Sequence, residues 1–360
     1  MNLVHFNDPS TAKKLLDGIH AHARKLDQVT IMEVCGTHTM EIGRLGLRPL
    51  LPENVELVSG PGCPVCVTPG TVIDRAAELA LEHDVTVCTF GDMMRVPGNK
   101  TSLENARRRG AAIEVVTSPL QVLQLAESNP SEEYVFIAVG FETTIPVVAR
   151  TVVIASEKRL SNISFIICHR LVPPALDVLI DDKDIALSGF LLPGHVSAII
   201  GMQAYAGLTG AKIPGVVTGF EPLDIIGGIQ AVMTLLTEHR YEVVNRYPRI
   251  VKPEGNPHAL QLMSEVFSPA DAVFRGIGPI PNSGLALQEQ FGSYDACRKY
   301  KIDIQEDIMP KGCSCGAVLK GIIRPDQCPL FAGACTPNSP VGPCMVSSEG
   351  SCAAYYRYER

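Results

Sequence analysis

An excess of basic residues is missing from this sequence. Its 360 residues contain 31 Lys and Arg against 38 Asp and Glu, which gives a formal charge of −7. Proteins that bind nucleic acid present a basic face to the phosphates, so this balance argues against that class. The one dense basic run, Arg107-Arg108-Arg109, is interpreted as the solvated face of a helix. A P-loop, the motif that cradles nucleotide phosphates, is also absent from the sequence.

Export and membrane signals are missing as well. The first residues, MNLVHFNDPSTAKK, lack the basic start and apolar core of a signal peptide. Residues 185–211 contain no Asp, Glu, Lys or Arg, but Pro193, His195, Gln203 and five glycines interrupt them. This stretch is too broken for a membrane-spanning helix and is interpreted as a buried strand, a turn and a buried helix. We therefore expect a cytoplasmic protein with no membrane attachment.

The length and the hydrophobic pattern predict an α/β protein of two or three domains, because 360 residues exceed one core of average size. Between residues 29 and 240, short β-branched runs alternate with helical patterns. The expected strands are Thr30–Val34, Val55–Val58, Val85–Phe90, Ile113–Val116, Tyr134–Val139, Ser164–Ile167, Ala186–Leu192 and Val216–Thr218. The expected helices include Thr71–Glu82, Leu103–Arg109, Leu120–Glu127, Ile145–Lys158 and Leu223–His239. This alternation predicts parallel sheets with helices on both faces.

Short polar or glycine-rich motifs follow many of these strands. They are EVCGTH, VSGPGCPVC, TFGDMM, AVGFETT, ICHR, LLPGHVS and VTGFEP. Ligands bind beyond the carboxyl ends of strands in open α/β sheets, so the motifs predict one shared cleft. The triplet Gly-Phe-Glu occurs at 140–142 and again at 219–221, each time between a strand and a helix. This echo suggests two similar α/β halves.

Six of the twelve cysteines lie close together near the C-terminus. They are Cys313, Cys315, Cys328, Cys335, Cys344 and Cys352. Thiols stay reduced in the cytoplasm, where metal binding and redox catalysis are the expected uses of cysteine. Residues 313–352 also hold five Pro, five Gly and only four charged residues. Such a segment cannot build a conventional core, so a metal is expected to organise it.

Thiolate-only ligation with uneven spacing predicts a [4Fe–4S] cluster in this tail. A zinc site usually shows two C-x-x-C or Cys/His knuckles, and the tail has no such knuckle and no histidine. Structural zinc and plain disulfides are the weaker alternatives. Four cysteines hold such a cluster, and the remaining pair is a candidate redox disulfide beside it. The spacing does not decide which four of the six bind.

The domain organisation is expected to have three parts. A first α/β domain covers residues 1–140, with a chain that can cross between halves, and a second covers 141–245. Residues 246–360 follow, with four prolines from Pro248 to Pro269 and helical stretches expected around 258–267 and 284–300. The predicted fold class is thus two related doubly wound parallel-sheet domains plus a Cys-rich C-terminal iron–sulfur domain.

A second group of thiols lies near the N-terminus. Cys63 and Cys66 stand in GPGCPVCVTPG, directly before a helix expected to begin at Thr68 and Pro69. A helix N-terminus carries partial positive charge and favours the thiolate form. The pair alone is typical of a thioredoxin-like C-x-x-C, but Cys35 also ends a strand, in EVCGTHTM, and can open onto the same cleft. Three thiolates at one crevice suggest a soft or borderline metal such as iron.

The histidines of these motifs are candidates for a supporting role. His38, three residues after Cys35, is a candidate metal ligand, thiolate-orienting group or proton carrier. His169 and His195 are weaker candidates, because a lone histidine is more often structural. The remaining cysteines stand in strand or helix patterns and are interpreted as core residues: Cys88, Cys168 and Cys297.

Taken together, these motifs resemble the HypD family of [NiFe]-hydrogenase maturation proteins. The matching segments are Cys35-Gly-Thr-His38, GPGCPVC (60–66), GFETT (140–144), PGHVS (193–197), GFEPLD (219–224), GCSCGAVLKG (312–321) and CPLFAGACTPNSPVGPCMVSSEGSCAAYYRY (328–358). The resemblance extends from residue 31 to the C-terminus. Long motifs in one order make chance agreement negligible, and the cysteines and His38 all match.

The resemblance implies a role in assembling the Fe(CN)2CO group of the hydrogenase active site. In that family the small chaperone HypC docks on HypD and shares the iron. HypE, charged with carbamoyl by HypF, delivers cyanide as a protein thiocyanate. Carried onto this chain, Cys35, Cys63 and Cys66 would form the iron site. The tail cluster would relay electrons, as in ferredoxin:thioredoxin reductase.

We therefore expect a metallocentre-assembly scaffold with redox activity, whose status as an enzyme is left open. The main alternative is a stand-alone thiol–disulfide oxidoreductase, in which the cluster feeds Cys63 and Cys66. Cys35 discriminates between the two, because a simple reductase needs only the pair. A purely structural subunit of an iron–sulfur complex would leave the N-terminal thiols without a function.

Overall fold

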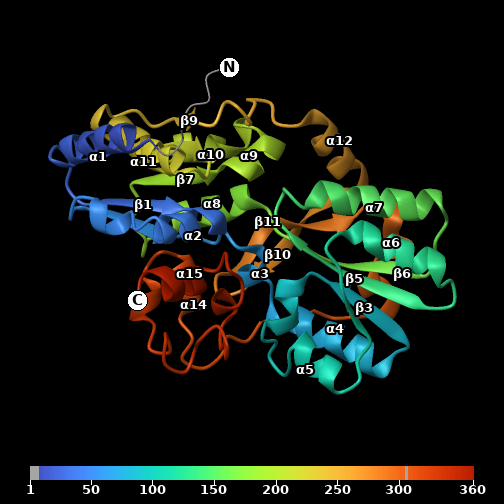
Figure 1. Ribbon diagram of the computed structural model, residues 1–360. Coiled ribbons are helices and arrows are strands. Elements are labelled where there is room, and N and C mark those ends of the chain that lie inside the picture. The colour runs from blue at the N-terminus through green and yellow to red at the C-terminus, as the bar shows by residue number, and fades with distance from the viewer. Residues whose placement is uncertain (1–7, 305–306) are drawn as a thin grey trace.

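The computed structural model describes residues 8–304 and 307–360, so the first half of the stretch that lacks signal-peptide features lies outside the described residues. Two α/β units lie side by side, and the cysteine-rich tail packs below the first and against the second (Figure 1). The predicted fold class, two doubly wound parallel sheets followed by a Cys-rich region, is confirmed. Within the described residues, no helix has the length and apolar character needed to cross a membrane.

Sheet A, the sheet of the first unit, has five parallel strands in the order β2-β1-β7-β8-β9. They are β1 (Val29–Glu33), β2 (Val55–Ser59), β7 (Gly189–Pro193), β8 (Gly215–Thr218) and β9 (Val243–Asn245). Helices α1 (Pro9–Ala23), α2 (Gly36–Arg44) and α11 (Pro222–Thr237) cover one face. The other face packs on α8 (Val172–Asp181), α10 (Ala206–Gly210) and the tail. Both faces are covered, which explains why the strands are continuously apolar.

Sheet B, the sheet of the second unit, has four parallel strands in the order β4-β3-β5-β6. They are β3 (Val85–Thr89), β4 (Ile113–Val115), β5 (Glu133–Gly140) and β6 (Ile163–His169). Helices α4 (Gly70–Glu82) and α5 (Leu103–Arg108) cover one face, and α6 (Pro119–Ser128) and α7 (Ile145–Glu157) cover the other. All eight predicted strands are present in the two sheets, and the short β9 was missed.

The chain crosses between the two units through α3 (Pro64–Val67) and returns through α8. Strands β1 and β2 therefore belong with β7, β8 and β9, although β3 to β6 come between them in sequence. A division by sheet thus differs from the boundary expected at residue 140, which falls at the end of β5 inside sheet B. The division into 1–140, 141–245 and 246–360 stays a prediction.

The segment after sheet A was only partly predicted. The helix expected around 258–267 is α12 (Pro257–Val266), but the one expected over 284–300 is wrong. There, an antiparallel hairpin of β10 (Phe267–Phe274) and β11 (Gly278–Leu287) is followed by a 3-10 turn and α13 (Ala296–Tyr300). The hairpin turns at Gly276 and Gly278, both with positive φ, which glycine adopts without strain. Its tip touches the tail, because a Cβ at Gly276 would lie 2.9 Å from Gly316 Cα.

The tail shares a hydrophobic core with sheet A. Five of its cysteines lie in or against the apolar cluster that contains Met32, Phe190 and Leu192 of the sheet. Helix α15 (Ser351–Tyr358) packs on α2, and Arg48 bonds the carboxylates of Glu359 and buried Glu33. The tail is therefore a built-in part of the first unit.

Candidate functional site

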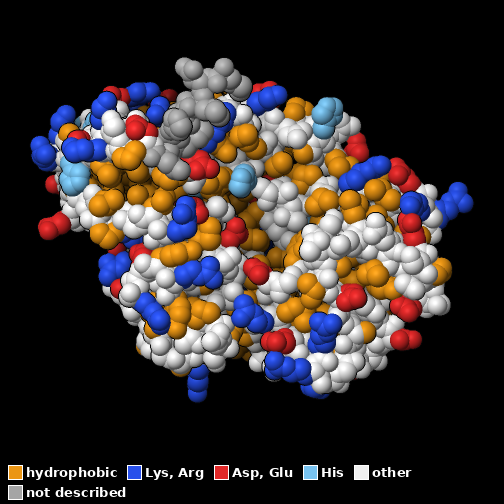
Figure 2. Space-filling model, viewed as in Figure 1, with side chains coloured by type: hydrophobic (Ala, Val, Ile, Leu, Met, Phe, Trp, Pro, Cys, Tyr) orange, Lys and Arg blue, Asp and Glu red, His pale blue; other side chains and the backbone are white. Residues whose placement is uncertain are grey.

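The N-terminal cysteines lie at the carboxyl edge of sheet A, where a ligand is expected. The strand order reverses between β1 and β7, and the crevice at such a reversal is the usual binding place. Cys35 follows β1 and caps α2, Cys63 follows β2, and α9 (Gly194–Ile200) with His195 follows β7. A hollow opens where the two units and the tail meet, with acidic side chains at its rim (Figure 2).

Cys35 stands at the start of a helix, yet its thiol is a weak acid. Burial raises the pKa of Cys35 to about 11, although the backbone N–H groups of His38 and Thr37 donate toward the sulfur and lower it. Desolvation of the thiolate outweighs the helix start at this position. Cys35 therefore carries a proton at neutral pH until a metal cation replaces that proton or a base accepts it.

Cys63 and Cys66 form a disulfide, with their Cα atoms 5.3 Å apart. Cys63 caps the four-residue helix α3, and the Cys66 N–H donates to Cys63 Sγ at 3.2 Å. The helix expected to begin at Thr68 and Pro69 is α4, which begins at Gly70 with Pro69 as its N-cap, and the separate short helix α3, which encloses Cys66, was not predicted. In the oxidised state neither sulfur is a thiolate, so neither can hold a metal.

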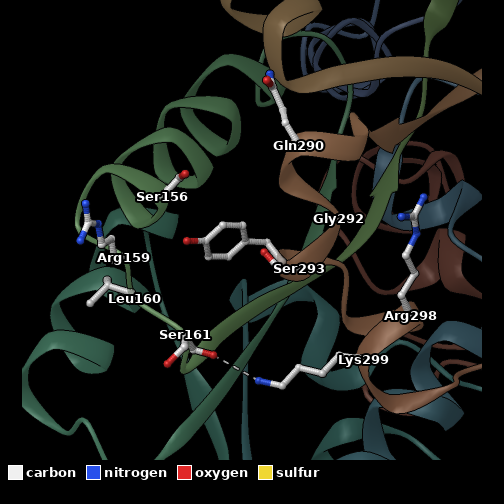
Figure 3. A pocket seen from close by; sticks show the side chains of 10 residues that line it. Ser156, Arg159, Leu160, Ser161, Gln290, Gly292, Ser293, Arg298 and Lys299 are labelled. Atoms are coloured by element: carbon white, nitrogen blue, oxygen red, sulfur yellow. Dashed lines mark hydrogen bonds between the residues drawn. The ribbon is translucent and has the colours of Figure 1, made fainter.

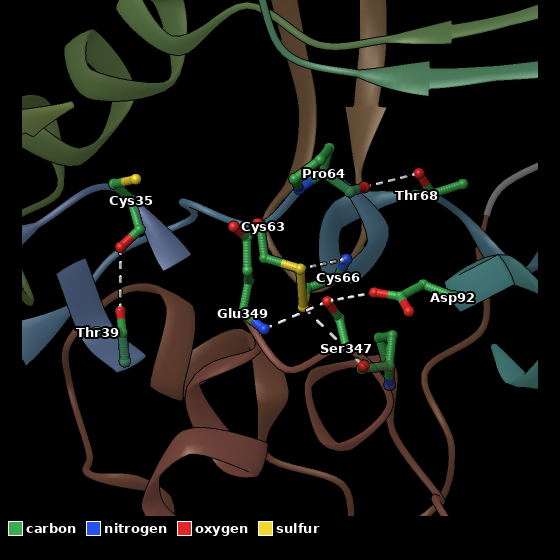
Figure 4. The surroundings of a disulfide bond; sticks show 10 residues. Cys35, Thr39, Cys63, Pro64, Cys66, Thr68, Asp92, Ser347 and Glu349 are labelled. Atoms are coloured by element: carbon green, nitrogen blue, oxygen red, sulfur yellow. Dashed lines mark hydrogen bonds between the residues drawn. A yellow bond between two sulfur atoms is a disulfide. The ribbon is translucent and has the colours of Figure 1, made fainter. Parts of the chain in front are cut away.

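The Cys63 loop packs directly on the Cys35 loop. Gly36 N–H donates to the Gly62 carbonyl at 3.0 Å, and a Cβ at Gly62 would lie 2.3 Å from the Cys35 nitrogen. The Cys35 sulfur nevertheless lies apart from the disulfide (Figure 4). Within the described residues, no three Cys, His, Asp or Glu side chains are arranged to hold a metal ion. The structure thus brings the three predicted thiols to one edge without converging them on one point.

A residue of the tail, Glu349, completes this edge. Its Oε1 accepts a hydrogen bond from Thr37 Oγ1 at 2.9 Å, and its N–H donates to Ser347 Oγ, which in turn donates to Asp92 at the edge of sheet B. Figure 4 places the Glu349 side chain between Cys35 and the disulfide. Burial raises the pKa of Cys35, and the Glu349 carboxylate raises it further. Burial lowers the pKa of His195, and the same carboxylate opposes part of that shift. Sequence reasoning missed Glu349, whose one signal is that it is among four charged residues in the tail.

His38 is buried at the same edge, and one nitrogen of its ring is already bonded to the backbone. Burial lowers the pKa of His38 to about 4, so the ring is neutral at pH 7. Its Nε2 donates to the Gly219 carbonyl at 2.9 Å, while Nδ1 has no hydrogen-bond partner in the described part of the chain. The ring of Phe220 lies 4.7 Å from that of His38 and 4.1 Å from that of His195. Two histidines therefore flank one phenylalanine beside Cys35.

The two Gly-Phe-Glu triplets occupy unlike places. Glu142, after β5, is buried; its Oε1 accepts the Val172 N–H at 2.9 Å, and burial raises its pKa to about 7. Glu221, after β8, caps α11 at the surface. His169 is buried beside Phe267, away from the sheet A edge. The repeated Gly-Phe-Glu triplet therefore marks two strand-to-helix turns and not two equivalent sites.

The tail thiols crowd together. Cys313 Sγ lies 3.2 Å from Cys315 Sγ, and hydrogen bonds join Cys344 to Cys315 and to Cys352. Hydrogen bonds from Cys315 and Cys344 lower the pKa of Cys352 to about 6. Hydrogen bonds to Cys315 and Cys352 raise the pKa of Cys344. Cys335 accepts a hydrogen bond from the Val341 N–H at 3.3 Å, and its charge acts to raise the pKa of Cys352.

The donor set suits an iron–sulfur cluster. A Cβ at Gly342 would lie 2.6 Å from both Cys313 Sγ and Cys315 Sγ, so only glycine leaves room for this backbone beside the sulfurs. Cysteine sulfurs are the soft donors that a cluster held by four thiolates needs, and here several of them lie close together in a buried place. Cys328 is half-buried at the end of a 3-10 turn.

The two thiol groups are neighbours in space. Cys66 Sγ lies 3.9 Å from the carbonyl oxygen of Pro343, the residue before Cys344. Cys63, Cys66 and Cys344 belong to one buried cluster, and α3 packs on the turn Pro343–Met345. A disulfide on the crossover between the two sheets thus lies directly against the tail's cysteine cluster.

A roomy cavity lies away from both cysteine sites. It has a volume of about 650 Å³ and lies between the end of α7 and residues 290–299 (Figure 3). Lys299 reaches the Ser161 carbonyl across it at 3.3 Å. Among the described residues that line it there is neither cysteine nor histidine, so it offers no thiolate or imidazole chemistry.

Comparisons with known proteins find relatives over nearly the whole chain. The family model described as "HypD: Hydrogenase formation hypA family" matches residues 10–359. The hydrogenase maturation factor HypD of Azotobacter vinelandii is 42% identical over 363 residues, covering 99% of this chain and 96% of its own. That of Cupriavidus necator is 41% identical over 367 residues, covering 99% and 97%. The maturation factor HypD2 of Bradyrhizobium diazoefficiens is 42% identical over 365 residues, covering 99% and 96%.

Proposed function

Because this chain belongs to the HypD family of hydrogenase-formation proteins, we propose that it assembles the Fe(CN)2CO group of [NiFe]-hydrogenase on its N-terminal thiols. A role in hydrogenase maturation comes with the family. One observation carries the finer proposal: the Cys63–Cys66 disulfide lies between the Cys35 edge and the tail thiols, with Cys66 Sγ 3.9 Å from the Pro343 carbonyl. A dithiol in that place can be switched by electrons and can hold iron when reduced.

Iron is the cargo in this proposal, and Cys35, Cys63 and Cys66 are its ligands. The disulfide must first take up two electrons and two protons, which turn it into two thiols. Thiolates are soft donors that make iron electron-rich, as cyanide and carbon monoxide ligands require. The Cys35 thiol loses its proton when the cation binds, since burial disfavours the free thiolate. His38 supports the site through its backbone N–H, which donates toward Cys35 Sγ.

A [4Fe–4S] cluster held by four of Cys313, Cys315, Cys328, Cys335, Cys344 and Cys352 would supply single electrons beside the disulfide. The chain provides the position. Residues 343–345 pack on α3, and Glu349 and Ser347 fasten the tail to both sheet edges. Tail and dithiol are thus held at a fixed spacing in a buried contact.

The partners are those that the resemblance to the HypD family implies. HypC is proposed to share the iron at the sheet A edge, and HypE to bring cyanide to it as a thiocyanate. Releasing cyanide from a thiocyanate takes two electrons, which a cluster in the tail would supply, because Cys63 and Cys66 cannot give them up and still hold the iron. The hollow between the two units and the tail, beside these thiols, is where we propose that the partners dock (Figure 2).

Infrared spectroscopy tests the proposal directly. Protein isolated without oxygen together with HypC should show CN and CO stretching bands, and Cys35→Ser should lose them while the tail keeps its iron. Serine preserves the size of the side chain but removes the soft donor, a larger loss than the roughly 10–100-fold that an outer partner of a metal site contributes. Full bands in Cys35→Ser would show that this thiolate does not hold the cargo.

A stand-alone thiol–disulfide oxidoreductase is the second candidate, because the dithiol lies against the tail cluster. Such an enzyme would reduce a disulfide substrate equally well with Cys35→Ser. Retained reductase activity in that variant, with no CN or CO bands in the wild type, would favour the second candidate.

A further inference from the structure

Basic side chains gather beside the tail, on a protein whose formal charge is −7. Two adjoining cavities of about 430 and 470 Å³ lie between α5, the turn Gly91–Arg95 and the tail. Four basic side chains and one acidic side chain, Glu104, line them. The basic residues, called the Arg95 surface below, are Arg95, Lys100, Arg107 and Arg108, and all four are exposed.

The Arg95 surface is held rigidly. Buried Asp74 accepts the backbone N–H groups of Asn99, Lys100 and Thr101 at 2.8 to 3.1 Å. A Cβ at Gly98 would lie 2.3 Å from Asp74 Oδ1, so this loop packs tightly against Asp74. The Lys100 ammonium lies 3.3 Å from Glu78, and Arg108 lies 3.0 Å from Glu104, with most of both basic side chains in solvent. Such charges attract an acidic partner at long range without a large interface.

The same surface touches the tail next to a buried cysteine. Arg95 Nη1 donates to the Pro337 carbonyl at 3.1 Å, and Asn338, Ser339 and Pro340 line the 430 Å³ cavity. Cys335 lies two residues before Pro337, and its sulfur accepts the N–H of Val341. The surface is thus on the outer side of the cysteine cluster, whereas the disulfide, next to Pro343 and Cys344, is on its inner side. Several Lys and Arg side chains are visible along this lower edge of the molecule (Figure 2).

We propose that the Arg95 surface docks an acidic one-electron carrier protein, of the iron–sulfur or flavin class, which delivers electrons into the tail beside Cys335. The inference rests on the proposed function, since an assembly cycle that reduces the Cys63–Cys66 disulfide needs an outside reductant. Each disulfide takes two electrons from two carrier encounters, each carrier being oxidised by one electron, and two protons from solvent. The S–S bond breaks and two S–H bonds form.

An acidic carrier fits better than a nucleic acid. Four basic residues, two of which are paired with Glu78 and Glu104, form a patch that is too small to follow a nucleic-acid backbone. Electron-transfer encounters are small, transient and steered by charge, which is what a rigid basic rim around a buried redox centre provides. Docking there also shortens the electron path, because only the tail loop separates the carrier from Cys335.

The test uses the full chain, purified without oxygen, and a reduced acidic plant-type [2Fe–2S] ferredoxin as the probe. Its oxidation is followed by stopped flow for the wild type, for Arg107→Glu/Arg108→Glu and for the single variant Arg107→Glu. The matched control is Arg24→Glu/Lys25→Glu, which makes the same charge change at exposed residues just after α1, on the other unit. We expect the double variant to react at least about 10-fold more slowly at low salt, the control to match the wild type, and the difference to vanish at high salt.

Zero-length carbodiimide cross-linking gives a readout that does not depend on electron transfer. Ferredoxin carboxylates should couple to Lys100, and the double variant should lose that product. Equal rates in all variants, cross-links confined to other lysines, or binding of RNA in place of ferredoxin at this surface would each overturn the proposal. If docking is seen but no Fe(CN)2CO forms, the assembly function fails and the docking site stands. If Fe(CN)2CO forms and the double variant reacts like the wild type, the docking proposal fails and the assembly function stands.

Discussion

The N-terminal and tail cysteine sites differ in what holds their sulfur atoms. Cys35 and Cys63 each follow a strand and cap a helix, so the frame of sheet A places them one at a time. The tail thiols lie on turns and short helices and touch one another, with Cys313 Sγ 3.2 Å from Cys315 Sγ. A site built by regular structure can keep its shape while empty. A site built by irregular loops depends on what its thiols bind.

The largest expected effect tests that dependence. Replacing the two thiols at the centre of the tail cluster, Cys315→Ser/Cys352→Ser, should remove the colour and about four irons per chain that we expect of anaerobically purified protein. Cys315 bonds Cys344 and Cys352 and touches Cys313, so every set of four ligands that uses either replaced residue is broken. Iron and sulfide analysis with the visible spectrum is the measurement.

The matched control is Cys297→Ser, a thiol that lies against α4 and sheet B, away from both sites. It should keep its colour and iron. A colourless wild type with one zinc per chain would show that the tail holds zinc, and the contrast between the two sites would then concern shape alone.

A second prediction asks whether the tail is truly part of the N-terminal site. A Cβ at Gly36 would lie 2.3 Å from the Glu349 carbonyl oxygen, so Gly36→Ala forces the tail away from α2. We expect a loss of about 1–3 kcal/mol, the usual cost of overpacking, seen as a lower thermal midpoint. Iron loading at the N-terminal thiols should also fall, while the tail keeps its iron.

Gly227→Ala is the control for this substitution. Gly227 lies inside α11, where a Cβ would meet its nearest atoms only at 4.0 Å. Alanine there should stabilise the helix by about 0.5–1 kcal/mol, because it restricts the unfolded chain. A Gly36→Ala protein as stable as Gly227→Ala would mean that the tail can leave α2 freely.

The strands and the motifs at their ends were easier to predict from the sequence than the contacts between residues far apart in the chain. Strand positions and the motifs at their ends follow from local hydrophobic pattern, and they brought Cys35, Cys63 and Cys66 correctly to the edge of sheet A. Glu349 could not be placed, since it reaches Thr37 across 312 residues and no local pattern encodes that contact. The hairpin in 267–287 was missed because Pro269, Pro279 and Pro281 obscure its strand pattern.

The division of the chain between the sheets was hidden for a similar reason. Each strand pairs with neighbours chosen by packing, and β1 pairs with both β2 and β7, of which the second lies far along the sequence. Periodicity reveals that a strand exists but not which sheet it joins. Local pattern therefore cannot show that the C-x-x-C lies on a crossover, which is what brings it against the tail.

The smallest expected effect compares thiol acidity at the two sites. Burial raises the pKa of Cys35 to about 11, and hydrogen bonds from Cys315 and Cys344 lower that of Cys352 to about 6. In reduced, cluster-free protein the alkylation rate of Cys35 by iodoacetamide should rise about tenfold per pH unit from about pH 7 to about pH 10 without a plateau, because only the thiolate reacts. Cys352 should react, if slowly, with little dependence on pH over that range.

The sign of the Glu349 effect follows from its charge. The carboxylate raises the pKa of Cys35, so Glu349→Gln, which can still accept the Thr37 hydrogen bond, should shift the Cys35 profile to lower pH. At any pH below the pKa, a larger thiolate fraction then means a few-fold faster alkylation. Exposed Glu254→Gln is the control and should leave the profile in place. Mass analysis of the Cys35 peptide measures both profiles. A plateau in the wild type near pH 9, the ordinary thiol value, would show that Cys35 is solvated, and the contrast in acidity between the two sites would be lost.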